Sequence, residues 1–316
     1  NGRDRTAVCC LSSLNLEKYD EWKDDAMMIN DVMRFLDNVL TDFIERAPDQ
    51  FADAKYSAAR ERSVGLGVMG FHSYLQKHSI PLESVMSKVW NKKIFKHIQE
   101  HVDQASKDLA DERGPCPDAA EYGFNERFSN KTAIAPTASI SIICGGASPG
   151  VEPVAANSYT HKTLSGSFNV RNRYLVELLE KHGKNNEDVW SGITTNQGSV
   201  SDLDFLTDHE KDVFKTAFEL DQKWIIELSG DRTPHISQAQ SINLFLAADV
   251  HKKELHKIHF DAWKKGLKSL YYCRSKSIQR AENVNDEKST DILANVYKQK
   301  PTAAKDPEYE ECLSCQ

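Results

Sequence analysis

The chain has 316 residues, 40% hydrophobic and 28% charged, which is typical of a globular protein large enough to bury a sizeable core. A formal net charge of -7 and the lack of any Lys/Arg run argue against a nucleic-acid-binding protein. No apolar run approaches the ~20 residues that a membrane-spanning helix requires. We therefore expect neither a nucleic acid nor a membrane as a partner.

The cysteine content favours a reducing cellular compartment. The chain contains seven cysteines, and its first residues, Asn1–Arg5, lack the apolar segment of a secretory signal peptide. An odd number of cysteines without such a signal favours a reducing environment, in which thiols are buried, catalytic or metal-bound. We therefore expect a cytoplasmic location. Because there is no initiating Met, we also expect either a processed chain or a piece of a longer one.

The first predicted element is a strand over Thr6–Leu16. Neighbouring strand residues point to opposite faces, so Cys9 and Cys10 are predicted to have different roles. Cys9 is either a redox thiol or a small core residue, and the pattern alone leaves both open. An amphipathic helix is predicted over Asp20–Ala47, where apolar residues recur at intervals of three and four.

Three glycines, Gly65, Gly67 and Gly70, form a G-x-G-x-x-G pattern within Ser63–Phe71. This pattern binds a dinucleotide when an apolar strand precedes it and an acidic residue follows ~20 positions later. Here the preceding residues are polar, and no acid lies between positions 84 and 99. We therefore favour the close packing of a helix on its neighbours over a nucleotide site.

The stretch Lys131–Pro153 follows a predicted helix over Trp90–Arg113. It begins as a short apolar run, Thr132–Ala135, and turns at Pro136. The next residues are Thr137, Ala138, Ser139, Ile140 and Ser141. Backbone N–H groups and hydroxyls gathered at such a turn can bind an anion, although the same residues also cap ordinary helices. This stretch alone leaves both interpretations open.

The rest of the chain alternates between helix and strand patterns. The further predicted helices are Tyr174–His182, His209–Leu228 and Leu255–Leu267, and the further strands are Thr163–Val170, Ile236–Ala247 and Ser269–Arg274. Strands that alternate with helices of this length predict right-handed βαβ units with parallel strands, and hence an α/β fold.

Tyr271 and Tyr272 are adjacent in the last predicted strand. On a regular strand their rings would face opposite ways, so they can stack only where the strand ends or bends. Stacked tyrosines can pass on an electron and a proton. The dipeptide is also explained by the β-propensity of tyrosine, so by itself it is weak evidence for such a role.

From about residue 281 the chain is polar, and we predict a mobile tail. The tail ends in a C-x-x-C pair, Cys312 and Cys315, which can cycle between dithiol and disulfide or supply half a zinc site. No second C-x-x-C or paired His motif completes four ligands, so we expect no bound metal. About 40 flexible residues have a reach of roughly 35 Å, enough to carry electrons into a domain interior.

Taken together and in this order, these segments resemble the large (alpha) subunit of class I ribonucleotide reductase. The matching segments are TAVCCLSSLNL, RERSVGLGVMGFHSYL, ERGPCPD, RFSNKTAIAPTASISII, GVEP, THKTLSGSF, ISQAQSINL, AWKKGLKSLYYCR and the terminal CLSC. The resemblance covers nearly the whole chain. It implies the second half of a ten-stranded α/β barrel over residues 1–280 and a redox tail over residues 281–316.

The resemblance also implies roles for individual residues. Cys9 matches one of the two cysteines that reduce the ribose, whereas Cys10 matches none. The loop residues Pro136, Thr137, Ala138, Ser139 and Ile140 match the loop that holds the substrate diphosphate. Tyr271 and Tyr272 match the pair that relays the radical. The tail pair, Cys312 and Cys315, matches the dithiol that re-reduces the active-site disulfide.

The implied reaction converts ribonucleoside diphosphates into 2′-deoxyribonucleoside diphosphates. No cofactor is expected to bind this chain directly, because the family's radical comes from the metal cofactor of a small (beta) subunit. Thioredoxin or glutaredoxin is the expected reductant. The implied partners are therefore the small subunit, one of these dithiol proteins and the nucleotide substrate.

Several parts of the family's active site have no counterpart in this sequence. The radical cysteine, the Asn and Glu beside it, and the partner of Cys9 all lie upstream in the family. We therefore expect this chain to work only with the upstream part of the alpha subunit in trans, as one half of a split subunit or as a fragment. Two alternatives remain: a cobalamin-dependent reductase, which generates its radical locally, and a non-catalytic assembly module.

Overall fold

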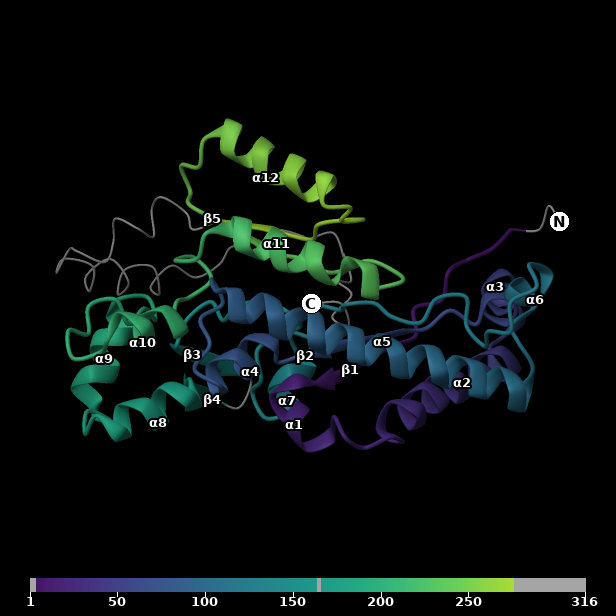
Figure 1. Ribbon diagram of the computed structural model, residues 1–316, viewed down its shortest axis with the longest axis horizontal. Helices are drawn as coiled ribbons and strands as arrows, with labels where there is room; N and C mark the ends of the chain where they lie inside the picture. The colour runs from purple at the N-terminus through teal and green to yellow at the C-terminus, as the bar shows by residue number, and fades with distance from the viewer. Residues whose placement is uncertain (1–3, 164–165, 276–316) are drawn as a thin grey trace, which may run out of the picture.

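The computed structural model describes residues 4–163 and 166–275, which form an elongated molecule with strands near its middle (Figure 1). The strands are β1 (Leu11–Asn15), β2 (Gly65–Met69), β3 (Ser158–Thr163), β4 (Gly166–Arg171), β5 (Leu244–Leu246) and β6 (Cys273–Ser275). The helices are α1 (Tyr19–Trp22), α2 (Met28–Arg46), α3 (Ala52–Glu61), α4 (Phe71–Lys77), α5 (Val85–Arg113), α6 (Pro117–Glu121), α7 (Ile140–Ile143), α8 (Arg173–Lys181), α9 (Glu187–Thr195), α10 (Asp208–Val213), α11 (Gln222–Arg232) and α12 (Lys252–Lys264).

Five extended segments of the described residues lie side by side, in parallel and in chain order. β1 pairs with β2, and β5 pairs with β6. Between these pairs, Leu66 of β2 forms a parallel bridge to Thr132, and Ile134 forms one to Gln240, just before β5. Helices connect the successive segments, as parallel pairing requires. The predicted α/β fold is confirmed, and five parallel segments are the number expected for half of a ten-stranded barrel.

Helices cover one side of these segments (Figure 1). The long helix α5 packs against both α2 and α11, and its buried face includes Ile94, Phe95, Ile98, Val102 and Leu109. α5 begins at the Ser84 cap, whose hydroxyl accepts the N–H of Ser87, and ends at Gly114, which has a positive φ of 83°. Within the described residues, no helix combines the length and apolarity needed to cross a membrane.

The glycine pattern at Gly65, Gly67 and Gly70 belongs to a strand, so the predicted helix packing was wrong. A Cβ on Gly67 would lie 2.2 Å from the carbonyl oxygen of Ala133, and one on Gly65 would lie 2.8 Å from the Ala133 Cβ. The glycines therefore allow β2 to lie against the third segment with almost no space between the backbones. Gly70, at φ 80°, then turns the chain into α4.

Several other elements differ from their predicted form. The helix predicted over Asp20–Ala47 is divided into α1 and α2, and the strands predicted over Ile236–Ala247 and Ser269–Arg274 are the shorter β5 and β6. The first strand begins at Leu11 rather than Thr6, and residues 158–163 and 166–171 form two antiparallel strands, β3 and β4, instead of one strand. The helix predicted over His209–Leu228 is interrupted between α10 and α11. There the Glu219 carboxylate accepts hydrogen bonds from both the N–H and the hydroxyl of Thr216, at 2.8 and 2.7 Å. Such local side-chain bonds compete with helical ones.

A buried ionic cluster joins α2 to its surroundings. The Asp37 side chain is fully buried and receives hydrogen bonds from Arg62, Arg113 and Arg127, each at 2.8 Å. Burial alone would raise the pKa of Asp37, but bonds from Arg127 and Arg113 and the charge of Arg62 lower it below its ordinary value. This carboxylate therefore fixes the ends of α3 and α5 on α2.

Candidate active site

A cavity of about 420 Å³ is lined by residues from, or next to, all five parallel segments. Cys9 precedes β1, Ser63 precedes β2, Pro136 follows the third segment, Gln240 lies before β5, and Tyr271 precedes β6. Three residues singled out from the sequence, Cys9, Pro136 and Tyr271, therefore line one cavity although they are far apart in the chain.

The two adjacent cysteines lie in opposite environments. Both cysteines are among the residues that line the cavity, but Cys9 is exposed, whereas Cys10 is 7% exposed and belongs to the hydrophobic core with Leu14. The Cys10 Sγ lies 3.8 Å from the carbonyl oxygen of Leu36, and burial raises the pKa of its thiol. Of the two thiols, Cys9 is therefore the more accessible to a molecule in the cavity.

The loop after Pro136 is held in a defined shape. Thr137 has a positive φ of 56°, and its Oγ1 accepts the N–H of Gly150 at 2.7 Å. The Thr137 carbonyl accepts the N–H of Ser141 at 3.0 Å, which begins the single turn α7. The next residues, 138–140, are exposed, and their N–H groups have no acceptor among the described residues. The cavity lining from this loop ends at Pro136, and the three adjacent donors lie on the exposed turn that follows it.

The tyrosine rings are in contact. The centroids of Tyr271 and Tyr272 are 4.1 Å apart, and the ring planes are tilted by 50°. The rings are 37% and 49% exposed, and the pair lies at the start of β6, where the regular strand has not yet begun. The rings therefore meet at a strand end, where we expected adjacent rings to be able to come together, but they are tilted rather than stacked. The Arg274 guanidinium lies 5.6 Å from the centroid of the Tyr272 ring.

Two buried residues beside this pair were not recognised from the sequence. Asn243 accepts the N–H of Tyr272 at 3.0 Å, and it donates to Glu152 at 2.6 Å. Both lie in segments that carried the resemblance, ISQAQSINL and GVEP. The available signal in the sequence was Glu152, an acidic residue within an otherwise apolar stretch. The tail pair, Cys312 and Cys315, lies outside the described residues.

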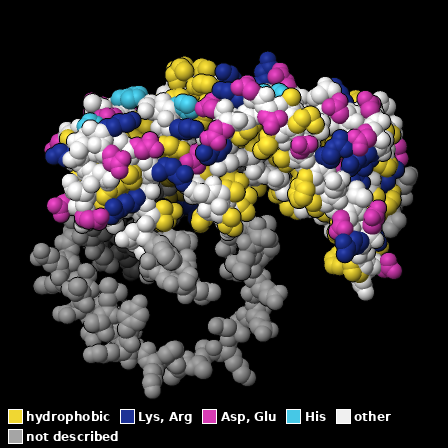
Figure 2. Space-filling view, turned by 90° about the horizontal axis from the view of Figure 1, so that it is seen from below, with side chains coloured by type: hydrophobic (Ala, Val, Ile, Leu, Met, Phe, Trp, Pro, Cys, Tyr) yellow, Lys and Arg dark blue, Asp and Glu magenta, His cyan; other side chains and the backbone are white. Residues whose placement is uncertain are grey.

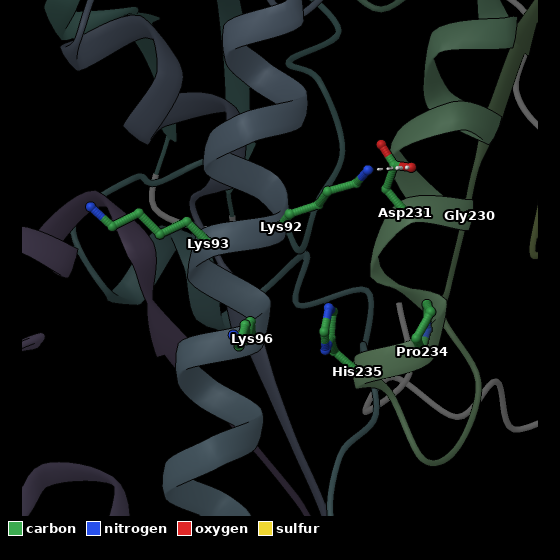
Figure 3. A pocket seen from close by; sticks show the side chains of 7 residues that line it. All are labelled: Lys92, Lys93, Lys96, Gly230, Asp231, Pro234 and His235. Atoms are coloured by element: carbon green, nitrogen blue, oxygen red, sulfur yellow. Dashed lines mark ion pairs between the residues drawn. The ribbon is translucent and has the colours of Figure 1, made fainter.

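A second cavity, of about 490 Å³, shares no residue with the first (Figure 3). Its lining residues are Lys92, Lys93, Lys96, Gly230, Asp231, Pro234 and His235. Lys93 points away from Asp231 in Figure 3, with its ammonium 4.6 Å from the centroid of the Trp90 ring. Lys92 pairs with Asp231 at 3.5 Å, and Lys96 pairs with a glutamate one turn along α5. These charges are already compensated, so the cavity is a poor anion site.

One face of the molecule carries both positive and negative side chains. On the face shown in Figure 2, Lys and Arg side chains are interspersed with Asp and Glu, and apolar side chains lie between them. This face therefore lacks the basic stripe that typifies nucleic-acid-binding proteins.

Five parallel segments joined by helices, with a cavity lined from all of them, define the chain as part of an α/β barrel domain. The chain belongs to the ribonucleotide reductase family: the model "Ribonucleotide reductase, barrel domain" matches residues 1–126 and 118–273.

Individual relatives carry the same name. The chain is 52% identical over 285 residues to the ribonucleoside-diphosphate reductase large subunit of Invertebrate iridescent virus 6, covering 89% of this chain and 30% of that protein. It is 45% identical to the large subunit of Invertebrate iridescent virus 3, covering 90% of this chain and 46% of that one. Among solved structures, the class Id ribonucleotide reductase alpha subunit of Actinobacillus ureae has a TM-score of 0.81 and 39% identity.

The aligned part of that structure covers 87% of this chain and 51% of the other. The chain therefore spans about half the length, or less, of the relatives that it matches. The predicted membership in the ribonucleotide reductase family is confirmed. The roles of the individual residues stay predictions.

Proposed function

We propose that this chain forms the C-terminal part of the catalytic barrel of a ribonucleoside-diphosphate reductase large subunit. The observation that carries the proposal is the meeting of Cys9, Pro136 and Tyr271 around one cavity. A reducing thiol, a diphosphate loop and the end of a radical relay must lie within reach of one nucleotide, and these three residues belong to those three elements. The names of the relatives support the same substrate class.

In this proposal Cys9 is one of two thiols that reduce the ribose. It supplies one sulfur of the disulfide that forms as the 2′-hydroxyl leaves as water, and the second thiol supplies the other. The exposed position of Cys9 suits this role, because both a substrate and a reducing dithiol must reach it. Cys312 and Cys315 would then return the two electrons, and thioredoxin or glutaredoxin would reduce the tail pair in turn.

The diphosphate is proposed to bind the loop from Pro136 to Ile140. The N–H groups of residues 138–140 and the Ser139 hydroxyl can donate to phosphate oxygens. The Thr137 hydroxyl already accepts the N–H of Gly150, so its part in binding is to hold the loop in shape while its own proton remains available.

The tyrosine pair is proposed to carry the radical between the small subunit and the cavity. Tyr271 lines the cavity, and Tyr272 lies against it at 4.1 Å, so the two rings form a continuous path from the outside inward. The metal that generates the radical belongs to the small subunit in this class, and the described residues contain no cluster of metal-ligating side chains.

The remaining active-site groups must come from residues beyond these 316. The radical cysteine and the second reducing thiol belong to the upstream part of the subunit, either in the same polypeptide or in a separate chain. Among the described residues, β1 and β6 each have a paired strand on one side only, so both edges of the half-barrel are available to the upstream strands.

Reconstitution tests the proposal. The full chain is combined with the upstream part of a large subunit and with the small subunit, and formation of 2′-deoxyribonucleoside diphosphate is measured. We expect activity only when all three are present. A complete mixture that assembles but neither binds nor reduces nucleoside diphosphate would favour the assembly module. Activity that requires added cobalamin and no small subunit would favour the cobalamin-dependent class.

A further inference from the structure

The side chain of Asn243 connects the tyrosine pair to a buried carboxyl group. Asn243 is 2% exposed, its Oδ1 accepts the N–H of Tyr272 at 3.0 Å, and its Nδ2 donates to Oε1 of Glu152 at 2.6 Å. Glu152 is 9% exposed, and burial raises its pKa, while the bond from Asn243 and the charge of Arg274 act in the opposite direction. Because both ends of the Asn243 amide are used, it cannot rotate without losing two buried hydrogen bonds.

The hydrogen bonds at this point are displaced from a regular strand pairing. Leu244 donates its N–H to the carbonyl of Tyr272 at 2.9 Å, and the β5–β6 pairing continues from there. In a regular parallel ladder, the N–H of Tyr272 would then donate to the carbonyl of Ile242. That carbonyl instead accepts the N–H of Tyr271 at 2.9 Å, and Asn243 accepts the N–H of Tyr272.

This one-residue displacement explains how two adjacent rings come into contact. Successive side chains of a regular strand point to opposite faces, which would separate the rings of Tyr271 and Tyr272. A bulge breaks the alternation and redirects a side chain. Without Asn243, the N–H of Tyr272 would be left unpaired or would return to the carbonyl of Ile242, and either change would alter the ring geometry.

We propose that Asn243 and Glu152 are positioning residues for the tyrosine pair. The Glu152 carboxylate orients the Asn243 amide, and the amide holds the displaced backbone that brings the two rings to 4.1 Å. The consequence for catalysis rests on the proposed function, since only a radical relay requires this contact. The structural part of the inference does not depend on it.

The first test replaces Asn243 by Leu in the full chain, assembled with the upstream part of the subunit and the small subunit. We expect kcat to fall by about tenfold or more while KM for the ribonucleoside diphosphate stays within about twofold, because substrate binding does not involve the relay. Amide hydrogen exchange of the peptide that covers residues 270–275 should become at least about tenfold faster.

A rescue experiment separates positioning from general packing. Asn243→Asp alone removes the donor and places a carboxylate against Glu152. We therefore expect kcat to fall and amide hydrogen exchange of residues 270–275 to become faster. Glu152→Gln alone keeps an acceptor for Asn243 and should change little. The double variant E152Q/N243D restores a donor–acceptor pair with reversed polarity, because the Gln amide can donate to the Asp carboxylate. We expect it to recover most of the kcat and the exchange protection that N243D loses.

Gln222 provides the matched control. It is also a buried amide, and its Oε1 accepts the N–H of Phe245 at 2.8 Å on the same strand, away from the tyrosines. Gln222→Leu should lower the unfolding temperature but leave the exchange of residues 270–275 unchanged. The inference is overturned if N243L resembles Q222L in both readouts, or if the double variant is no better than N243D. If the unmodified assembly lacks reductase activity, the proposed function fails, and hydrogen exchange still decides the positioning role.

Discussion

At the residue scale, the molecule gives two neighbouring thiols different chemistry. Cys9 is exposed at the cavity, and Cys10 lies in the core with a pKa raised by burial. A buried thiol with a raised pKa is a poor nucleophile, because the thiolate is the reactive form. The sequence predicted different environments for the two cysteines from strand alternation, and their exposure does differ, although both precede β1, which begins at Leu11.

Changing each cysteine to Ser should therefore give different results. We expect Cys9→Ser to abolish multiple turnover in the reconstituted enzyme, and Cys10→Ser to retain turnover with a modest loss of stability. Iodoacetamide should label Cys9 rapidly and Cys10 only on unfolding, which mass spectrometry of the tryptic peptides can measure. Equal labelling of both thiols in the folded protein would contradict the assignment.

The tyrosine pair makes a second prediction at this scale. Tyr272→Phe should abolish multiple turnover while leaving ribonucleoside diphosphate binding unchanged, because Phe preserves the ring contact but cannot be oxidised in the same way. Tyr122, which is 81% exposed and remote from the cavity, supplies the control, and Tyr122→Phe should retain full activity. Retained turnover in Y272F would refute the relay role.

The sequence predicted the tyrosines, the loop and Cys9, but it did not predict Asn243 or Glu152. The first group consists of contiguous motifs whose resemblance is visible in the chain itself. The second depends on a side-chain amide that replaces a backbone acceptor, with its partner 91 positions away. No periodicity or local spacing indicates such a contact, because it joins the loop that follows α7 to the residue before β5.

At the element scale, the glycines of β2 determine how closely two parallel segments approach. Their spacing suggested helix packing, since the polar residues before them did not resemble a buried strand. In the structure those residues form α3, and the strand itself begins only at Gly65. The long helix α5 was predicted from Trp90 to its end, and the helix predicted over Asp20–Ala47 contains α2 but is interrupted before it. The interruption before α11 depends on local side-chain bonds.

Gly67→Ala should destabilise the protein by about 1–3 kcal/mol, because the new methyl group would overlap the carbonyl oxygen of Ala133. The displaced segment leads into the loop at Pro136, so KM for the nucleotide should also rise. Gly192→Ala is the matched control, since it lies within α9 with open space around its Cα, and it should be neutral or stabilising by about 0.5–1 kcal/mol. Thermal unfolding and steady-state kinetics measure both effects.

At the scale of the whole molecule, the Asp37 cluster links elements that are distant in the sequence. Asp37→Asn should cost about 3–5 kcal/mol at neutral pH, because it leaves buried arginines without their anion. The pKa of Asp37 is lowered on folding, so its contribution is present above its ordinary value of 3.8 and is lost as the pH falls through the lower folded value. In urea unfolding, the difference in free energy of unfolding between the unmodified protein and Asp37→Asn should therefore be large at pH 7 and smaller in strong acid.

Asp42 on the same helix provides a comparison for this prediction. It pairs with Arg46 at 3.0 Å on the surface, and both side chains are more than half exposed. Asp42→Asn should change the free energy of unfolding by no more than about 0.5 kcal/mol. A similar effect of the two substitutions would show that the buried cluster does not hold the helices together.

The two open edges of the parallel set also constrain how a complete barrel can close. β1 and β6 lie at opposite ends of the row of five segments, and each has a paired strand on one side only among the described residues. If the upstream part of the subunit completes the barrel as proposed, its strands must pair with both β1 and β6. A barrel paired at only one of these edges remains open. A substitution that disrupts pairing at one edge should therefore also weaken pairing at the other.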